Sequence, residues 1–248
     1  MNRVQSLAIR GMIFLENNNV VEVSVTILAW CVIAWIAYRL YNRQSDKPKI
    51  WKVLVVMLVG LFSFSFNTEI FGTVMRIPIL PLGVWVLYAY FRKKNEEWQT
   101  YRPFAWFGFA ANFILLIFSL LAVPIFQVMY PGSEPSTYLS NIDDASIIPI
   151  HPGVKHQEMD KENALASILD FTEEPMHSTD WYYGANLGED STNTQEKFPY
   201  QLIGAIPKWG SGLISVVYIE EDGKGLLIST PKEQHYFRLK DSLIEGGN

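Results

Sequence analysis

Two histidines and one aspartate have the residue types that a metal site needs. His151, His156 and Asp160 fall within ten residues of one another, and imidazole and carboxylate groups suit zinc or manganese. Because Pro152-Gly153 separates the two histidines, a loop could bring their rings together. The spacing matches no established ligand pattern, and solvated histidines beside an acidic helix start explain it without a metal. We therefore expect no metal and no cofactor, and we keep these three residues as the candidates for a metal site.

Other catalytic groupings are incomplete. His177 and Asp180 have the types of a base and its orienting acid, but no nucleophile lies near them in the sequence. The chain has no phosphate-binding loop, dinucleotide fingerprint or calcium loop. Its one cysteine, Cys31, lies in an apolar run and is interpreted as a small apolar residue. We expect a protein that is not an enzyme, with a membrane-anchored metal-dependent hydrolase as the alternative.

One pair of opposite charges falls inside the apolar half of the chain. Glu69 and Arg76 are seven residues apart, so they lie two turns apart on one helix face or meet across a turn. Ionisable groups at membrane depth are costly and usually mark a pathway or a pairing. The pair could shape an external vestibule, contact a partner protein, or stabilise a hairpin as a solvated pair at the outer interface. A small channel or permease subunit is the second alternative function.

Aromatic residues in an acidic setting suggest a binding surface. Trp181, Tyr182 and Tyr183 lie in a long acidic passage, and Trp209 follows a lysine near the C-terminal strands. Exposed aromatic side chains suit a partner or carbohydrate surface. They could equally close one end of a small core or rest against the bilayer. We take these four residues as candidates for a partner surface.

Apolar runs in the first half of the chain predict a membrane protein. The stretch 106–129 has 24 residues without a formal charge, which at about 1.5 Å per residue is enough for about 30 Å of hydrocarbon. Together the runs predict an integral membrane α-helical bundle. We place its four transmembrane helices within 20–129, at about 20–41, 53–68, 74–91 and 104–129.

The two middle spans are irregular. Their uninterrupted apolar parts, Val53–Phe66 and Ile77–Phe91, have only 14 and 15 residues, whereas a straight span usually needs about 20. Either both segments bend and tilt as a tight hairpin, or the earlier helix continues and carries Glu69 into the outer leaflet.

The distribution of charge predicts the orientation in the membrane. Residues 1–129 carry 12 Lys or Arg against 6 Asp or Glu, whereas 130–248 carry 8 against 19. Five basic residues crowd the connection 39–52 and four crowd 92–102, and basic short loops face the cytoplasm. We therefore expect a multi-pass protein of the cell membrane whose tail, 1–19, and C-terminus are both extracytoplasmic.

The acidic second half predicts a water-facing part. We expect a Pro-rich stalk at 130–155, with Ser146–Ile150 as a short edge strand, and a small extracytoplasmic α+β domain at 156–248. A helix over 157–171 would cover one side of a C-terminal antiparallel sheet of three or four strands, in which Asp222-Gly223 is a hairpin turn. The strands are expected at Tyr200–Ile206, Leu213–Ile219, Gly225–Ser229 and His235–Lys240.

The charge balance also limits the partners. The net charge of −11 on 130–248 argues against nucleic acid, because binding to it depends on Lys and Arg neutralising phosphates. We expect the lipid bilayer and another envelope or membrane protein as partners. The first hypothesis is a non-enzymatic accessory, sensory or envelope-assembly component whose acidic extracytoplasmic domain binds a partner protein or ligand.

Overall fold

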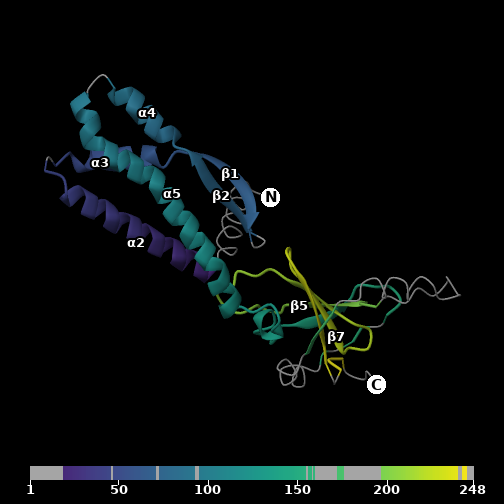
Figure 1. Ribbon diagram of the computed structural model, residues 1–248. Helices are drawn as coiled ribbons and strands as arrows, with labels where there is room; N and C mark the ends of the chain where they lie inside the picture. Colours follow the sequence, from purple (N-terminus) through teal and green to yellow (C-terminus); the bar gives the residue numbers. More distant parts are fainter. Residues whose placement is uncertain are drawn as a thin grey trace, which may run out of the picture. The chain divides into compact units, whose positions relative to one another are not determined.

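The chain divides into two compact units (Figure 1). The helical unit is Val21–Ile125, and the sheet unit contains Val20 and the residues from Phe126 onward. The computed structural model of the protein describes residues 19–45, 47–70, 73–92, 95–154, 156–157, 159, 172–175, 197–239 and 242–244.

Four helices carry the apolar runs of the first half. They are α2 (Val20–Asn42), α3 (Ile50–Gly60), α4 (Leu82–Phe91) and α5 (Asn95–Met129). Among the described residues, α2 and α5 are the two helices that are long and apolar enough to cross a membrane. Helices α3 and α4 have 11 and 10 residues, so each is only about 15 Å long.

The prediction of four transmembrane helices is therefore not supported. The predicted spans 20–41 and 104–129 lie within α2 and α5. The predicted spans 53–68 and 74–91 each contain a helix and a strand rather than one continuous helix.

The strands β1 (Phe64–Ile70) and β2 (Thr73–Leu80) replace the expected ends of the two middle helices. They pair antiparallel, and in Figure 1 they continue the chain beyond α3 and α4 as a hairpin. A short apolar run suits a strand as well as a helix. Pro78, which lies within β2, also lacks the amide hydrogen that a helix interior needs.

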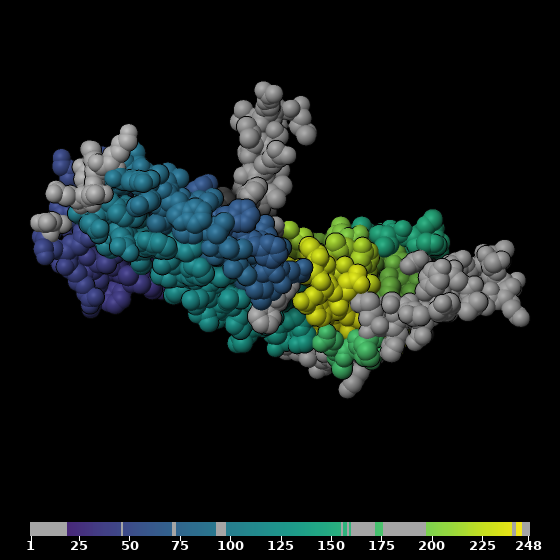
Figure 2. Space-filling view, turned by 45° about the horizontal axis from the view of Figure 1, so that its top comes forward, coloured from purple at the N-terminus to yellow at the C-terminus, as the bar shows by residue number. Residues whose placement is uncertain are grey.

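Glycines bring three helices of this unit into close contact. A Cβ built on Gly60 would meet the carbonyl of Ala105, and one built on Gly108 would meet that of Met57, so α3 and α5 touch backbone to backbone. A Cβ on Gly83 of α4 would meet the carbonyl of Val59 in α3. Small residues allow this close packing between helices in lipid, and in Figure 2 the blue and teal residues of these helices form a continuous surface.

Where α3 ends, neighbouring segments donate hydrogen bonds to the free backbone carbonyls. The Asn112 side-chain amide of α5 donates to the carbonyl of Leu61 at 3.0 Å, and the backbone amide of Gly83 donates to the carbonyl of Phe62 at 2.7 Å. Non-helical backbone in apolar surroundings needs such partners. The helix can therefore end at this point without leaving these carbonyls unpaired.

The sheet unit contains a six-stranded antiparallel sheet in the order β3-β5-β6-β7-β8-β4. A 3-10 turn, η1 (Pro135–Thr137), precedes the first strand. The strands are β3 (Ser146–Pro149), β4 (Thr172–Glu174), β5 (Tyr200–Ile203), β6 (Val216–Ile219), β7 (Gly225–Ser229) and β8 (Gln234–Arg238). The expected edge strand is confirmed as β3, and the sheet is larger than the three or four strands predicted.

Registered rows of side chains build the core on one face of the sheet. One row reads Ile147, Leu202, Val217, Ile228 and His235, and the next reads Tyr200, Ile219, Leu226, Phe237 and Glu173. The aliphatic members are buried, as is Phe237. Each row therefore begins apolar and ends in an ionisable side chain at the β8–β4 edge.

The residues before β3 also pack into this core. Five buried side chains, Tyr138, Leu139, Ile142, Ala145 and Ile147, come from the segment that we assigned to a stalk. The segment 130–155 is thus continuous with the sheet unit. Nearly all of the helix predicted over 157–171 lies outside the described residues.

Candidate functional site

His235 lies where an aliphatic row of the core reaches the sheet edge. Strand register pairs it with Ile228 of β7. Its ring stacks on the Phe237 ring at a centroid distance of 6.1 Å and lies tilted at 5.9 Å from the buried Tyr138 ring. The His235 side chain is only 14% exposed. The strand alternation that buries Phe237 therefore also holds an imidazole at the border between the core and solvent.

Two carboxylates face the two nitrogens of this imidazole. Nδ1 of His235 lies 2.8 Å from Glu173 Oε1, and Nε2 lies 3.3 Å from Glu233 Oε2. Each carboxylate can accept a hydrogen bond from the ring nitrogen that it faces. The contact to Glu173 ties β4 to β8.

A shallow hollow opens beside this histidine. Its volume is about 350 Å³, and it is lined by Glu173, Glu174, Pro175, Gln234, His235 and Tyr236. Burial is the main cause that raises the pKa of the nearby Tyr138 to about 12, with the negative charges of Glu233 and Glu173 adding to it. Tyr138 thus stays a neutral phenol at physiological pH, and the hollow presents the carboxylates of Glu173 and Glu174 beside the imidazole.

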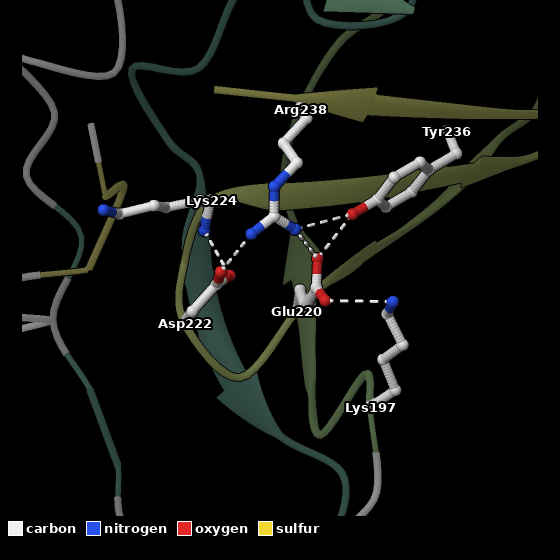
Figure 3. Close-up of polar contacts among 6 residues, drawn as sticks. All are labelled: Lys197, Glu220, Asp222, Lys224, Tyr236 and Arg238. Carbon is white, nitrogen blue, oxygen red and sulfur yellow. Dashed lines mark hydrogen bonds and ion pairs between the residues drawn. The ribbon is translucent and has the colours of Figure 1, made fainter. Parts of the chain in front are cut away.

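A second polar cluster lies on the opposite face of β8 (Figure 3). Tyr236 Oη and Arg238 Nη1 both donate to Glu220 Oε2, at 2.6 Å and 2.8 Å, and Lys197 Nζ lies 3.2 Å from Glu220 Oε1. Arg238 Nη2 donates to Asp222 at 2.8 Å. A Cβ on Gly225 would meet the Glu220 carboxylate, so the absence of a side chain there makes room for the cluster.

The charges of this cluster are paired with one another, which gives it a structural role. Two carboxylates face two cations, and the contacts join the β6–β7 turn to β8. Burial, and then the hydrogen bond to Glu220, raises the pKa of Tyr236 to about 12. The hydrogen bond with Tyr236 is the main cause that raises the pKa of Arg238. Neither group is poised to exchange a proton at neutral pH.

The metal-site candidates are described only in part. His151 Nδ1 accepts a hydrogen bond from the backbone amide of Gly153 at 3.2 Å, and His156 is exposed. Asp160 lies outside the described residues, as do His177 and Asp180. Within the described ranges, no group of three or more His, Cys, Asp or Glu side chains is arranged to hold a metal ion.

The membrane charge pair lies on the β1–β2 hairpin. Glu69 is registered opposite Val74, and Arg76 opposite Asn67, so Glu69 and Arg76 share one face as diagonal neighbours. Both side chains are exposed. No ion pair joins these two described residues, so the arrangement brings the charges to one face without pairing them.

Of the aromatic candidates, Trp209 is the one that the structure describes. Its side chain is 85% exposed, in the loop between β5 and β6. Trp181, Tyr182 and Tyr183 lie outside the described residues. Sequence reasoning missed the Glu173–His235–Glu233 arrangement, although His235 shares the strand parity of the apolar Phe237 and Leu239, which was the available signal.

Comparison with known proteins adds no assignment to this geometry. The sequence matches no family model, and neither the curated proteins nor the solved structures include a match.

Proposed function

We propose that the protein is a multi-pass component of the cell membrane whose extracytoplasmic sheet unit binds a partner. The role is accessory, sensory or in envelope assembly, and it is not enzymatic. The observation that carries the proposal is the hollow at the β4–β8 edge, where Glu173 and Glu174 stand beside a histidine held between carboxylates.

The surface of the helical unit supports a membrane location. Large apolar side chains point outward from all four helices, among them Ile27, Trp35, Leu58, Trp85 and Ile117, each at least 51% exposed. Water-exposed helices normally turn such residues inward. In this proposal α2 and α5 cross the bilayer, while α3 and α4 enter it together and the β1–β2 hairpin carries Glu69 and Arg76 toward the outer surface.

One contact supports the proposed orientation. The side-chain amide of Gln44 donates to the carbonyl of Thr100 at 2.9 Å, so the two basic connections, 39–52 and 92–102, are in direct contact. Two basic segments at one end of the unit fit a common cytoplasmic face. The sheet unit, which follows α5, then lies on the extracytoplasmic side together with both chain ends.

The chemistry of the hollow supports a basic partner in this proposal. Glu174 is exposed and lines the hollow beside Glu173, and the region 130–248 carries a net charge of −11. Complementary charge gives a partner specificity and a faster encounter. A segment of another envelope protein that presents Lys or Arg would satisfy these carboxylates, whereas they would repel an acidic segment.

Isolation of the full chain from native membranes in mild detergent tests the proposal. The unchanged protein should retain a specific partner, and Glu174→Gln should lose it, because Glu174 lines the hollow without a structural contact to break. Glu134→Gln, an exposed acid elsewhere on the sheet unit, is the matched control and should retain the partner. Repeated isolation of the protein alone, or equal retention by Glu174→Gln, would overturn the proposal.

A further inference from the structure

We propose that the loop Lys208–Gly210 rests in the outer lipid headgroup layer, with Trp209 as its lipid-contacting side chain. The inference rests on the membrane location proposed above, and it gives Trp209 a lipid surface as its partner. Tryptophan favours the membrane–water boundary because its ring is apolar and its indole N–H can still reach polar groups.

Three hydrogen bonds join this loop to the first residue of α2, the last residue of α5 and the residue after α5. Lys208 Nζ donates to the carbonyl of Met129, the last residue of α5, at 3.1 Å. Tyr130 Oη donates to the carbonyl of Trp209 at 3.1 Å. The amide of Val20, the first residue of α2, donates to the carbonyl of Gly210 at 2.8 Å.

Gly210 makes this fit possible. Its φ is +76°, in the left-handed region that favours glycine. A Cβ at this position would lie 2.7 Å from Val20 Cγ2 and 3.0 Å from Tyr130 Oη. The loop is thus held between Val20 and Tyr130, which belong to the same unit as the loop.

The exposure of the side chains identifies the occupant as lipid. Trp209 is 85% exposed and Val128, in the last turn of α5, is 82% exposed, which are the two highest values among the large apolar side chains of the described residues. They belong to segments that the contacts above hold together. If α5 crosses a bilayer, Val128 faces its outer boundary, and the same boundary then reaches Trp209. The cationic Lys208 beside it suits anionic headgroups.

Labelling at single cysteines tests the inference in the full chain. Cys31 is the only cysteine, so Cys31→Ser provides a background for Trp209→Cys, Val128→Cys and Glu221→Cys. Each protein is labelled with nitrobenzoxadiazole and reconstituted in vesicles of phosphatidylethanolamine and phosphatidylglycerol, with or without nitroxide-bearing lipid. Glu221 is the matched control, because it lies beyond the opposite end of β6 from the loop.

The expected result is a blue-shifted emission and a severalfold larger quenching at positions 209 and 128 than at 221. Quenching at 209 no greater than at 221, while 128 is quenched, would overturn this inference and leave the membrane location standing. A water-exposed label at 128 would overturn both. A label at 209 that is exposed in pure lipid vesicles but shielded in native membranes would overturn lipid as the occupant and indicate a protein partner.

Discussion

The helical unit and the sheet unit each bury an apolar cluster but present different surfaces. In the helical unit, glycines bring backbones into contact at Gly60, Gly83 and Gly108 beside a small buried apolar cluster, and many other large apolar side chains face outward. In the sheet unit, apolar side chains fill the inside and the charged groups lie at the edge and on the outer face. The difference agrees with the membrane location proposed above for the helical unit, since water favours the burial of apolar side chains and lipid does not.

The largest loss of stability is expected from a substitution where the backbones of two helices touch. Gly83→Ala would press a methyl group against the carbonyl of Val59, which cannot move without separating α4 from α3. The cost should be about 3 kcal/mol or more, at the upper end of overpacking. Titration of the purified protein with dodecyl sulfate, followed by circular dichroism, measures it. Gly153→Ala, whose nearest contact is the half-buried His151 ring at 3.3 Å, should leave the transition unchanged, and equal transitions for both variants would contradict the comparison.

A smaller loss of stability is expected in the sheet unit when the ion-pair cluster around Glu220 is broken. Glu220→Gln removes the shared anion of Arg238, Lys197 and Tyr236, and the Glu220 side chain is only 12% exposed. Loss of a partner for charged hydrogen bonds should cost about 2 kcal/mol. Chemical unfolding followed by tryptophan fluorescence checks this value. Glu134→Gln is the control, and an equal loss in both variants would show that the cluster adds nothing specific.

A third effect should appear at alkaline pH and again only in the sheet unit. The folded protein holds the phenol proton of Tyr236 with a pKa of about 12, against 10.0 for an ordinary tyrosine. Its contribution to stability is therefore complete below about pH 10 and is lost as the pH rises through about 12, by about 1 kcal/mol at pH 11. Unfolding free energies measured from pH 9 to pH 12 should fall less steeply in Tyr236→Phe than in the unchanged protein. Parallel curves would contradict the burial of this phenol.

The smallest effect is expected inside the helical unit. Asn112→Leu removes the side-chain donor to the carbonyl of Leu61, and hydrogen bonds between transmembrane helices average about 0.6 kcal/mol. The same detergent titration should show a small shift for Asn112→Leu and none for Ser119→Ala, an exposed position of the same helix. A shift as large as that of Gly83→Ala would mean that hydrogen bonding, rather than close packing, holds these helices together.

The sequence predicted the elements that depend on residues close together in the chain. Helices α2 and α5 follow long apolar runs, and the β6–β7 hairpin follows Asp222-Gly223, where Gly223 takes a φ of +69°. The β1–β2 hairpin was missed because its strands have only seven and eight residues, and segments this short fit a helix or a strand equally well. Tertiary contacts such as Asn112 to Leu61 decide between them, and these join residues far apart in the chain.

The candidate site was missed for the same reason. Glu173 and His235 are 62 residues apart, and only the pairing of β4 with β8 brings them together. The alternation of β8 does reveal that His235 shares a face with Phe237. It does not reveal which residues lie beyond the sheet edge, so the carboxylate partners could not be read from the sequence.

The proposed function places the helical unit in the bilayer and the sheet unit outside the cytoplasm. Single cysteines at Lys49, in the first basic connection, and at Glu221, on the sheet unit, test it in intact cells treated with a membrane-impermeant maleimide. The cysteine of Glu221→Cys should react at once, and that of Lys49→Cys only after the membrane is permeabilised. Protection of position 221 together with labelling of position 49 would contradict the account.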